Sequence, residues 1–351
     1  MRNKKGKKKV GTKTADKSEQ RNAASGLIPL SLRERGRRRA KLGDPAWFNS
    51  RREERPAPKY TKSAGGVLLP KHLLKGANAL VHKSFVPVEA ELSLSPAIVG
   101  RPTQRLLRRF SGKKVIPAND TWIEGNDDRQ IYFDATFPWC SIGQVITPTG
   151  RGTGTLAGKN FVLTASHVVA GLWTPGQPLT QPITFVPAMF GGSSILGPTW
   201  TANVTGIAAW KEINDVVGYD VAICQLDQPM GDWLGAFGSR GYSEDWEGNA
   251  WWEHAGYPYD LSPNGDQPCY QFQITIDDDD DDDFDTVELE TDADIASGQS
   301  GGPLWAIFND GGHQIVGVLS GRDDDFLESS NVFAGGSGLN ALVKWGRDNW
   351  G

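Results

Sequence analysis

The chain has few cysteines and lacks a long apolar run. Among 351 residues there are three cysteines, Cys140, Cys224 and Cys269, which excludes a disulfide-dense scaffold and allows one bridge at most. No stretch of roughly 18 uncharged apolar residues occurs, which argues against a transmembrane helix. The basic opening, residues 1–20, is not followed by an apolar core, so it does not read as a signal peptide.

Charge is distributed very unevenly between the two parts of the chain. Residues 1–114 contain 29 Lys and Arg against 8 Asp and Glu, whereas residues 115–351 contain 8 against 34, and the whole chain carries a net charge of −5. Residues 1–65 are basic and poor in large apolar side chains, so we expect a largely disordered tail. Such a tail is either a plain solvated segment or a nucleic-acid-binding one, and we favour the first interpretation.

Residues 66–120 differ from the tail because short apolar clusters alternate with prolines. Val67 to Leu69, Leu73 with Leu74, and the group around Phe85 suit a loosely folded segment that leans on another surface. A basic segment beside an acidic body is typical of a pro-region held by weak, salt-sensitive contacts, and a plain linker is the equal alternative.

Residues 121–351 carry short apolar runs separated by Gly, Pro, Asn and Asp. The runs at 142–146, 154–156, 161–163, 221–226 and 315–319 predict an all-β barrel or sandwich. At the end of the chain, apolar side chains at helical spacing predict a helix over about 338–350.

Three segments in this region carry candidate chemistry. His167 follows an apolar run and can exchange a proton near neutral pH. Asp220 precedes a strongly apolar run, where a carboxylate needs a partner such as a histidine N–H. Ser300 stands in Gly298-Gln299-Ser300-Gly301-Gly302-Pro303, and the N–H groups of Gly298 and Ser300 could converge on one oxyanion. Each segment alone also fits a structural role, but together they supply a nucleophile, a base and an orienting carboxylate.

These segments resemble the trypsin-like serine proteases. Thr164-Ala165-Ser166-His167, Asp220-Val221-Ala222-Ile223 and the Ser300 segment are similar to the motifs of that family and occur in its order. The segments at 125–129, 137–139 and 256–258 resemble its V8-like, glutamyl-endopeptidase branch. The resemblance implies two six-stranded antiparallel barrels of the chymotrypsin type, at about 137–235 and 236–337, followed by the C-terminal helix. It also implies peptide-bond hydrolysis by His167, Asp220 and Ser300, without a cofactor or metal.

Several positions depart from the family pattern. Gln299 stands where trypsin-like zymogens have an aspartate that receives the new N-terminal ammonium, so we predict no salt-bridge switch of that kind; a cut near 110–125 could still free the cleft. The resemblance places Asp294, Ser320, Gly321 and Arg322 in the substrate pocket. Asp294 favours cleavage after basic residues, but Arg322 could neutralise it, and an unassigned pocket is the alternative. The bridge that trypsin-like enzymes often have beside the catalytic histidine is absent, because Val168 follows His167. Cys140 and Cys269 could pair with each other, whereas Cys224 is expected to be a buried hydrophobe.

The remaining expectations concern the acidic run and the partners. For Asp277 to Asp283 we expect a mobile surface loop, with a Ca²⁺ site or docking of the basic segment as alternatives. We expect a secreted monomer that acts on proteins or peptides, contacts its own basic N-terminal segment, and binds neither membranes nor nucleic acid. An inactive binding module of the same fold, or a nucleic-acid-associated protein acting through residues 1–60, are the rival functions.

Overall fold

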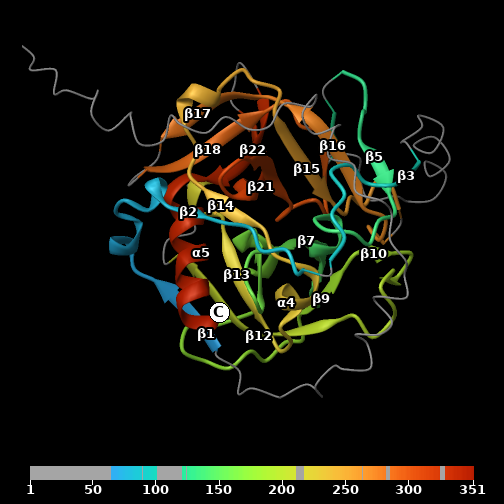
Figure 1. Ribbon diagram of the computed structural model, residues 1–351. Helices are drawn as coiled ribbons and strands as arrows, with labels where there is room; N and C mark the ends of the chain where they lie inside the picture. Colours follow the sequence, from blue (N-terminus) through green and yellow to red (C-terminus); the bar gives the residue numbers. More distant parts are fainter. Residues whose placement is uncertain are drawn as a thin grey trace, which may run out of the picture.

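The computed structural model describes residues 65–88, 90–100, 121–123, 125–210, 217–262, 264–281, 285–324 and 329–351. The basic tail, residues 1–64, and the stretch 101–120 lie outside these ranges. Figure 1 shows two groups of strands, one above the other, with the C-terminal helix along one flank. The described part has no helix that is long and apolar enough to cross a membrane.

Six antiparallel strands of the first half close into a barrel. Their order around the barrel is β12, β13, β8, β7, β6 and β9, and a further pairing of β9 with β12 completes the ring. The strands are β6 (Ile142–Ile146), β7 (Arg151–Leu156), β8 (Phe161–Thr164), β9 (Thr184–Pro187), β12 (Ala202–Trp210) and β13 (Ala222–Leu226). The apolar runs of the sequence therefore became barrel strands, because alternate side chains fill the interior, such as Val145, Leu156 and Phe185.

The second half is a longer curled sheet. Its hydrogen-bonded order runs β17, β18, β22, β21, β20, β15, β16, β5 and β3, with β14 paired to β21 and β2. The main strands are β15 (Trp252–Gly256), β16 (Cys269–Ile274), β17 (Ile276–Asp281), β18 (Thr286–Thr291), β20 (Pro303–Phe308), β21 (Gly312–Asp324) and β22 (Ser329–Gly335). One residue, Thr275, separates β16 from β17, so a single bent stretch of chain borders both sides of the group formed by the five strands β18, β22, β21, β20 and β15.

The remaining elements are short, apart from the last helix. Helix α5 spans Gly336–Trp350 and buries Leu339, Leu342 and Val343, which confirms the predicted C-terminal helix. Short strands are β1 (Gly65–Leu69), β2 (Val81–His82), β3 (Ile98–Gly100), β4 (Thr121–Trp122), β5 (Gln130–Tyr132), β10 (Met189–Phe190), β11 (Ser193–Ser194), β14 (Gly238–Arg240) and β19 (Ile295–Ala296). Short helices are α4 (Met230–Leu234) and the 3-10 turns η1 (Lys71–Leu74), η2 (Ala77–Ala79), η5 (Trp139–Ser141), η6 (Ser166–Val169), η7 (Val217–Tyr219) and η8 (Glu244–Trp246).

Residues 65–100 are built into the fold rather than leaning loosely on it. In Figure 1 this segment, blue to cyan, runs across the molecule from β1 near α5 to β3 beside β5. β1 pairs in parallel with β12, β2 pairs with β14, and β3 pairs with β5. Leu69, Leu74 and Ala77 are at most 2% exposed and belong to the main core. The expectation of a loosely folded segment is therefore wrong for these residues. The apolar clusters predict burial, but the sequence does not show that β12, β14 and β5 each have an edge with which this segment can pair.

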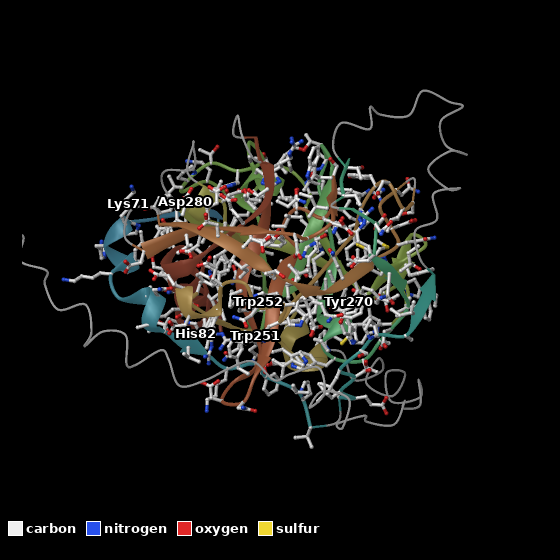
Figure 2. The ribbon with its side chains drawn as sticks, turned by 90° about the horizontal axis from the view of Figure 1, so that it is seen from above. Lys71, His82, Trp251, Trp252, Tyr270 and Asp280 are labelled. Atoms are coloured by element: carbon white, nitrogen blue, oxygen red, sulfur yellow. The ribbon has the colours of Figure 1, made fainter. Side chains whose placement is uncertain are left out.

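The acidic run is not a surface loop along its first part. Asp277 to Asp281 lie in β17, which pairs with β18, so that Asp278 faces Glu290 and Asp280 faces Glu288. β17 is the last strand of its sheet, and Asp280 lies toward the periphery of the molecule in Figure 2. The carboxylates of Asp277, Asp278 and Asp280 are exposed to solvent, which removes the cost of burial, and charges on an edge strand discourage further pairing. Asp282 and Asp283 lie outside the described residues.

The cysteines are all free and buried. Burial raises the pKa of each thiol to about 12, so the thiolates are not available near neutral pH. Cys140 and Cys269 therefore form no bridge in this structure, and Cys224 lies in the first barrel's core as predicted.

Candidate active site

His167 stands immediately after a barrel strand. β8 ends at Thr164, and the 3-10 turn η6 carries His167 beyond it. The side chain of His167 is 44% exposed, so the ring is open to solvent on one side. The rigid strand fixes the backbone of the turn, which gives a proton-transferring ring a defined place.

Asp220 holds the other side of that ring. Its Oδ2 lies 2.7 Å from His167 Nδ1, and its Oδ1 accepts the backbone N–H of His167 at 2.9 Å. Two hydroxyls, Ser166 Oγ and Ser320 Oγ, also donate to the carboxylate, each at 2.6 Å. With four donors around it, this largely buried carboxylate stays ionised despite its burial.

The pKa values of the pair move in opposite directions. Burial alone would lower the pKa of His167, but its hydrogen bond with Asp220 and the carboxylate's charge raise it above its usual value. For Asp220, burial alone would raise the pKa, and the bonds from His167, Ser166 and Ser320 lower it. The pair therefore stabilises the protonated form of the imidazole relative to a free ring, beside a carboxylate that is more readily ionised than a free one.

The Ser300 turn lies between β19 and β20, against the barrel that carries His167. Ser300 O accepts the N–H of Thr153 at 2.8 Å, and Gly298 O accepts Thr153 Oγ1 at 2.9 Å. A Cβ added to Gly301 would lie 3.0 Å from the backbone nitrogen of Ala165, two residues before His167. The turn and the histidine therefore lie on neighbouring stretches of chain.

A second set of bonds ties the Ser300 turn to Asp220. Gly301 N–H donates to Leu319 O, and Leu319 N–H donates to Gly302 O, both at 2.9 Å. The residue after Leu319 is Ser320, whose hydroxyl binds Asp220. One short stretch of β21 thus connects the turn to the carboxylate.

The glycines of the turn have a steric reason. Gly298 has φ +97°, and an added Cβ would lie 2.4 Å from Tyr257 O. Among the described residues, the N–H groups of Gly298 and Ser300 donate to no backbone carbonyl, whereas the intervening Gln299 N–H donates to Ala296 O at 3.0 Å. Two donors therefore remain on the turn, as the oxyanion prediction requires.

The predicted pocket residues are only partly brought together. Ser320 contacts Asp220, Gly321 has open space where a Cβ would stand, and the exposed Arg322 lies over the Trp122 ring, 3.2 Å from its centroid. Asp294 is 1% exposed, and its Oδ2 accepts the backbone N–H of Asp128 at 3.1 Å.

Sequence reasoning missed the side chains that support the site. Ser166 and Ser320 donate to Asp220, but Ser320 had been assigned to the pocket alone. Arg129 reaches the residue before Ser300, with its Nη1 3.0 Å from Gln299 Oε1. The sequence marks the segment 125–129 through its resemblance to the V8-like branch, but it does not show that Arg129 is buried against the Ser300 turn.

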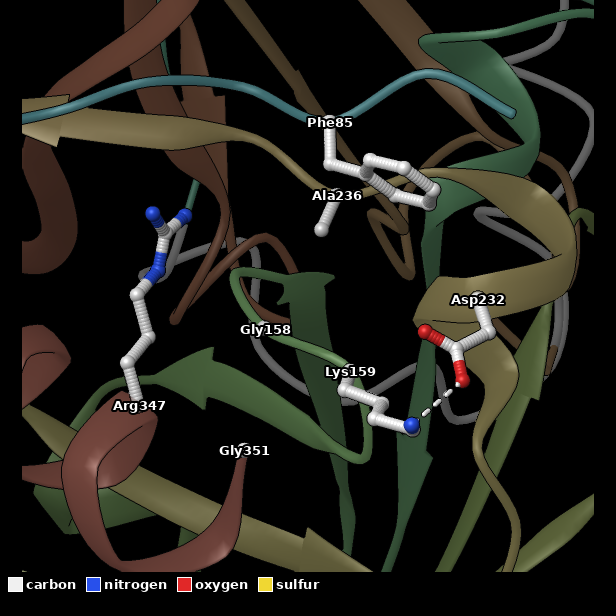
Figure 3. Close-up of a pocket in the computed structure, with 7 residues that line it drawn as sticks. All are labelled: Phe85, Gly158, Lys159, Asp232, Ala236, Arg347 and Gly351. Atoms are coloured by element: carbon white, nitrogen blue, oxygen red, sulfur yellow. Dashed lines mark ion pairs between the residues drawn. The ribbon is translucent and has the colours of Figure 1, made fainter. Parts of the chain in front are cut away.

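A separate cavity of about 240 Å³ lies elsewhere (Figure 3). It is lined by Phe85, Gly158, Lys159, Asp232, Ala236, Arg347 and Gly351. Lys159 pairs with Asp232 at 3.0 Å, and Arg347 donates to three backbone carbonyls. The polar side chains that line this cavity thus already bind other groups of the protein. None of the candidate active-site residues lines it.

The barrel architecture and the His167–Asp220 pair beside a glycine-rich serine turn define a serine protease of the chymotrypsin fold. The Trypsin family model matches residues 132–337, and the chain belongs to this family, whose members are serine-type endopeptidases.

Solved structures with a similar fold include three proteases. A Glu endopeptidase in complex with MPD is 19% identical with a TM-score of 0.48, and the match covers 67% of this chain and 100% of the other. The thermostable serine protease AL20 from an extremophilic microorganism is 18% identical with a TM-score of 0.42, covering 60% and 98%. The protease Anisep from Arthrobacter nicotinovorans is 21% identical with a TM-score of 0.43, covering 60% and 98%. No curated protein matches the chain.

Proposed function

We propose that the protein hydrolyses peptide bonds through a triad of His167, Asp220 and Ser300. Ser300 Oγ attacks the scissile carbonyl, and His167 accepts its proton and returns it to the leaving amine. Asp220 fixes the tautomer of the ring and stabilises the imidazolium. Water then attacks the acyl-enzyme by the same route in reverse, and the acid product leaves.

The observation that carries this proposal is the His167–Asp220 pair. A Nδ1–Oδ2 distance of 2.7 Å orients the ring so that its other nitrogen is left for the nucleophile. The backbone bonds of the Ser300 turn with Thr153 in β7 and Leu319 in β21 hold the turn beside the neighbour of β8 and beside Ser320, which binds Asp220. The N–H groups of Gly298 and Ser300 would then stabilise the oxyanion of the tetrahedral intermediate.

A fluorophosphonate probe tests the proposal directly. It phosphonylates an activated serine whatever the substrate preference. We expect covalent labelling of the purified full chain and hydrolysis of casein, with both lost in Ser300→Ala. Loss of a triad serine costs on the order of 10⁶ in kcat. Wild-type protein that is folded but neither labels nor cleaves would instead indicate an inactive binding module.

The preference before the cut is part of the proposal. Asp294 supports a basic residue there, because it stands six residues before Ser300, where the resemblance to trypsin places the aspartate of the substrate pocket. Its burial and its bond from Asp128 limit how much of that charge reaches a substrate. The exposed Arg322, two residues after Ser320, instead supports an acidic residue before the cut. Peptide-library profiling decides between them: a basic preference that disappears in Asp294→Asn supports Asp294, and an acidic preference that disappears in Arg322→Gln refutes it.

A further inference from the structure

A buried arginine stands behind the Ser300 turn. Arg129 is 1% exposed, and its guanidinium donates to Asp127 at 2.8 and 3.0 Å and to Asp260 at 2.6 and 3.3 Å. Burial alone would lower the pKa of Arg129, but the two carboxylates raise it well above its usual value. A charge buried this completely is costly unless it is paired, and here both partners are supplied by the chain itself.

The remaining contact of this arginine is with the residue before Ser300. Arg129 Nη1 donates to Gln299 Oε1 at 3.0 Å, and the same oxygen accepts the backbone N–H of Ala296 at 2.9 Å. Gln299 is fully buried, and its own backbone groups bind Ala296 and Gly302. The glutamine is thus fixed through both its side chain and its backbone.

The segment 127–129 touches the turn's approach at a second point. Asp128 N–H donates to the carboxylate of Asp294 at 3.1 Å. The segment therefore contacts the chain at Asp294 and again at Gln299, the residue between the two N–H donors of the turn. Movement of Gln299 would displace both donors, because the Ser300 N–H belongs to the peptide group that follows Gln299 and Gly298 is bonded directly to the nitrogen of Gln299.

We propose that Arg129 is a positioning residue that holds the oxyanion turn in its working conformation by binding Gln299. This inference rests on the function proposed above. The charge that orders the turn comes from within the chain, held by Asp127 and Asp260, so a newly cut N-terminal ammonium is not needed. The neutral Gln299 is the matching acceptor, because one amide oxygen receives both the guanidinium and a backbone N–H.

Three variants of the full chain separate this role from general stability. Arg129→Gln removes the charge, and Gln299→Met removes the acceptor while leaving Arg129 with both carboxylates. The matched control is Arg240→Gln in β14, because Arg240 is also buried and also binds a glutamine, Gln314, and an aspartate, Asp310, and these bonds do not involve Gln299.

The readouts are the second-order rate of fluorophosphonate labelling, the low-field proton resonance of the His167–Asp220 pair, and the melting temperature. We expect Arg129→Gln and Gln299→Met to slow labelling by about 10²–10³, the effect of losing one oxyanion donor, with the low-field resonance retained. Arg240→Gln should lower the melting temperature while labelling within about threefold of wild type.

Each outcome bears on the inference. Wild-type labelling rates in folded Gln299→Met, or equal slowing in Arg240→Gln, would overturn it. If Arg129→Gln does not fold, Gln299→Met still decides, since it leaves the ion pairs intact. Failure of the wild-type chain itself to label would refute the proposed function, whereas labelling of all variants at one rate would refute only the role of Arg129.

Discussion

Leu74 offers the sharpest test of whether residues 65–100 belong to the folded protease. Its side chain is fully buried in the main core, and the turn η1 that carries it packs against the C-terminal helix α5. Leu74→Ala removes about three methylene equivalents, or about 2.4 kcal/mol of transfer free energy. The residual cavity adds to this, so we expect a loss of about 2–5 kcal/mol in the free energy of unfolding.

Urea unfolding measures that loss. With a slope of about 3 kcal/mol per molar urea, the midpoint should fall by about 1 M. The matched control is Val88→Ala in the same segment, because Val88 is 97% exposed and its truncation should change stability by less than about 0.5 kcal/mol. Both variants are made in a Ser300→Ala background to prevent self-digestion.

The result that would refute the reasoning is equal midpoints for the two variants. It would mean that residues 65–100 do not contribute to the cooperative unit. If the midpoint falls as expected, a cut near 110–125 leaves these residues attached to the protease through β1 and the buried leucines. Only the part of the basic segment outside residues 65–100 could then be released as a pro-region.

Two further predictions concern the chemistry. Because Asp220 raises the pKa of His167 and the reaction needs the unprotonated ring, kcat/KM should rise with pH through a value above 6.5. The contribution of His167 to stability has the opposite sign: it is full below 6.5, where Asp220 is still ionised, and is lost as pH rises through the raised pKa. The contribution of Asp220 is present above 3.8 and is lost as pH falls through its lowered pKa. Asp220→Asn should lower kcat by about 10⁴, and an unchanged pH–rate profile in that variant would contradict the assignment. Gly298→Ala should slow fluorophosphonate labelling at least tenfold, because its Cβ would lie 2.4 Å from Tyr257 O at a positive φ, whereas Gly150→Ala, with open space around the added carbon, should label normally.

The sequence determined the local elements and the identity of the reactive groups. Apolar runs between turn residues gave β6, β8 and β13 nearly to the residue, because a barrel strand buries alternate side chains whatever its partners are. The segments carrying His167, Asp220 and Ser300 were recognisable because their residue types are dictated by proton transfer and tight turns, which act over a few neighbouring residues.

The tertiary structure decided everything that depends on pairing across distance. The first part of the acidic run forms an edge strand because it pairs with β18. Residues 65–69 join the first barrel because β9 pairs only with residues 202 and 203 of β12 and leaves the edge of residues 206–210 to β1. The bond from Ser320 to Asp220 and the bond from Arg129 to Gln299 join residues 100 and 170 positions apart. Separations of this size leave no periodic pattern in the chain, so only the folded geometry could assign these side chains to the site.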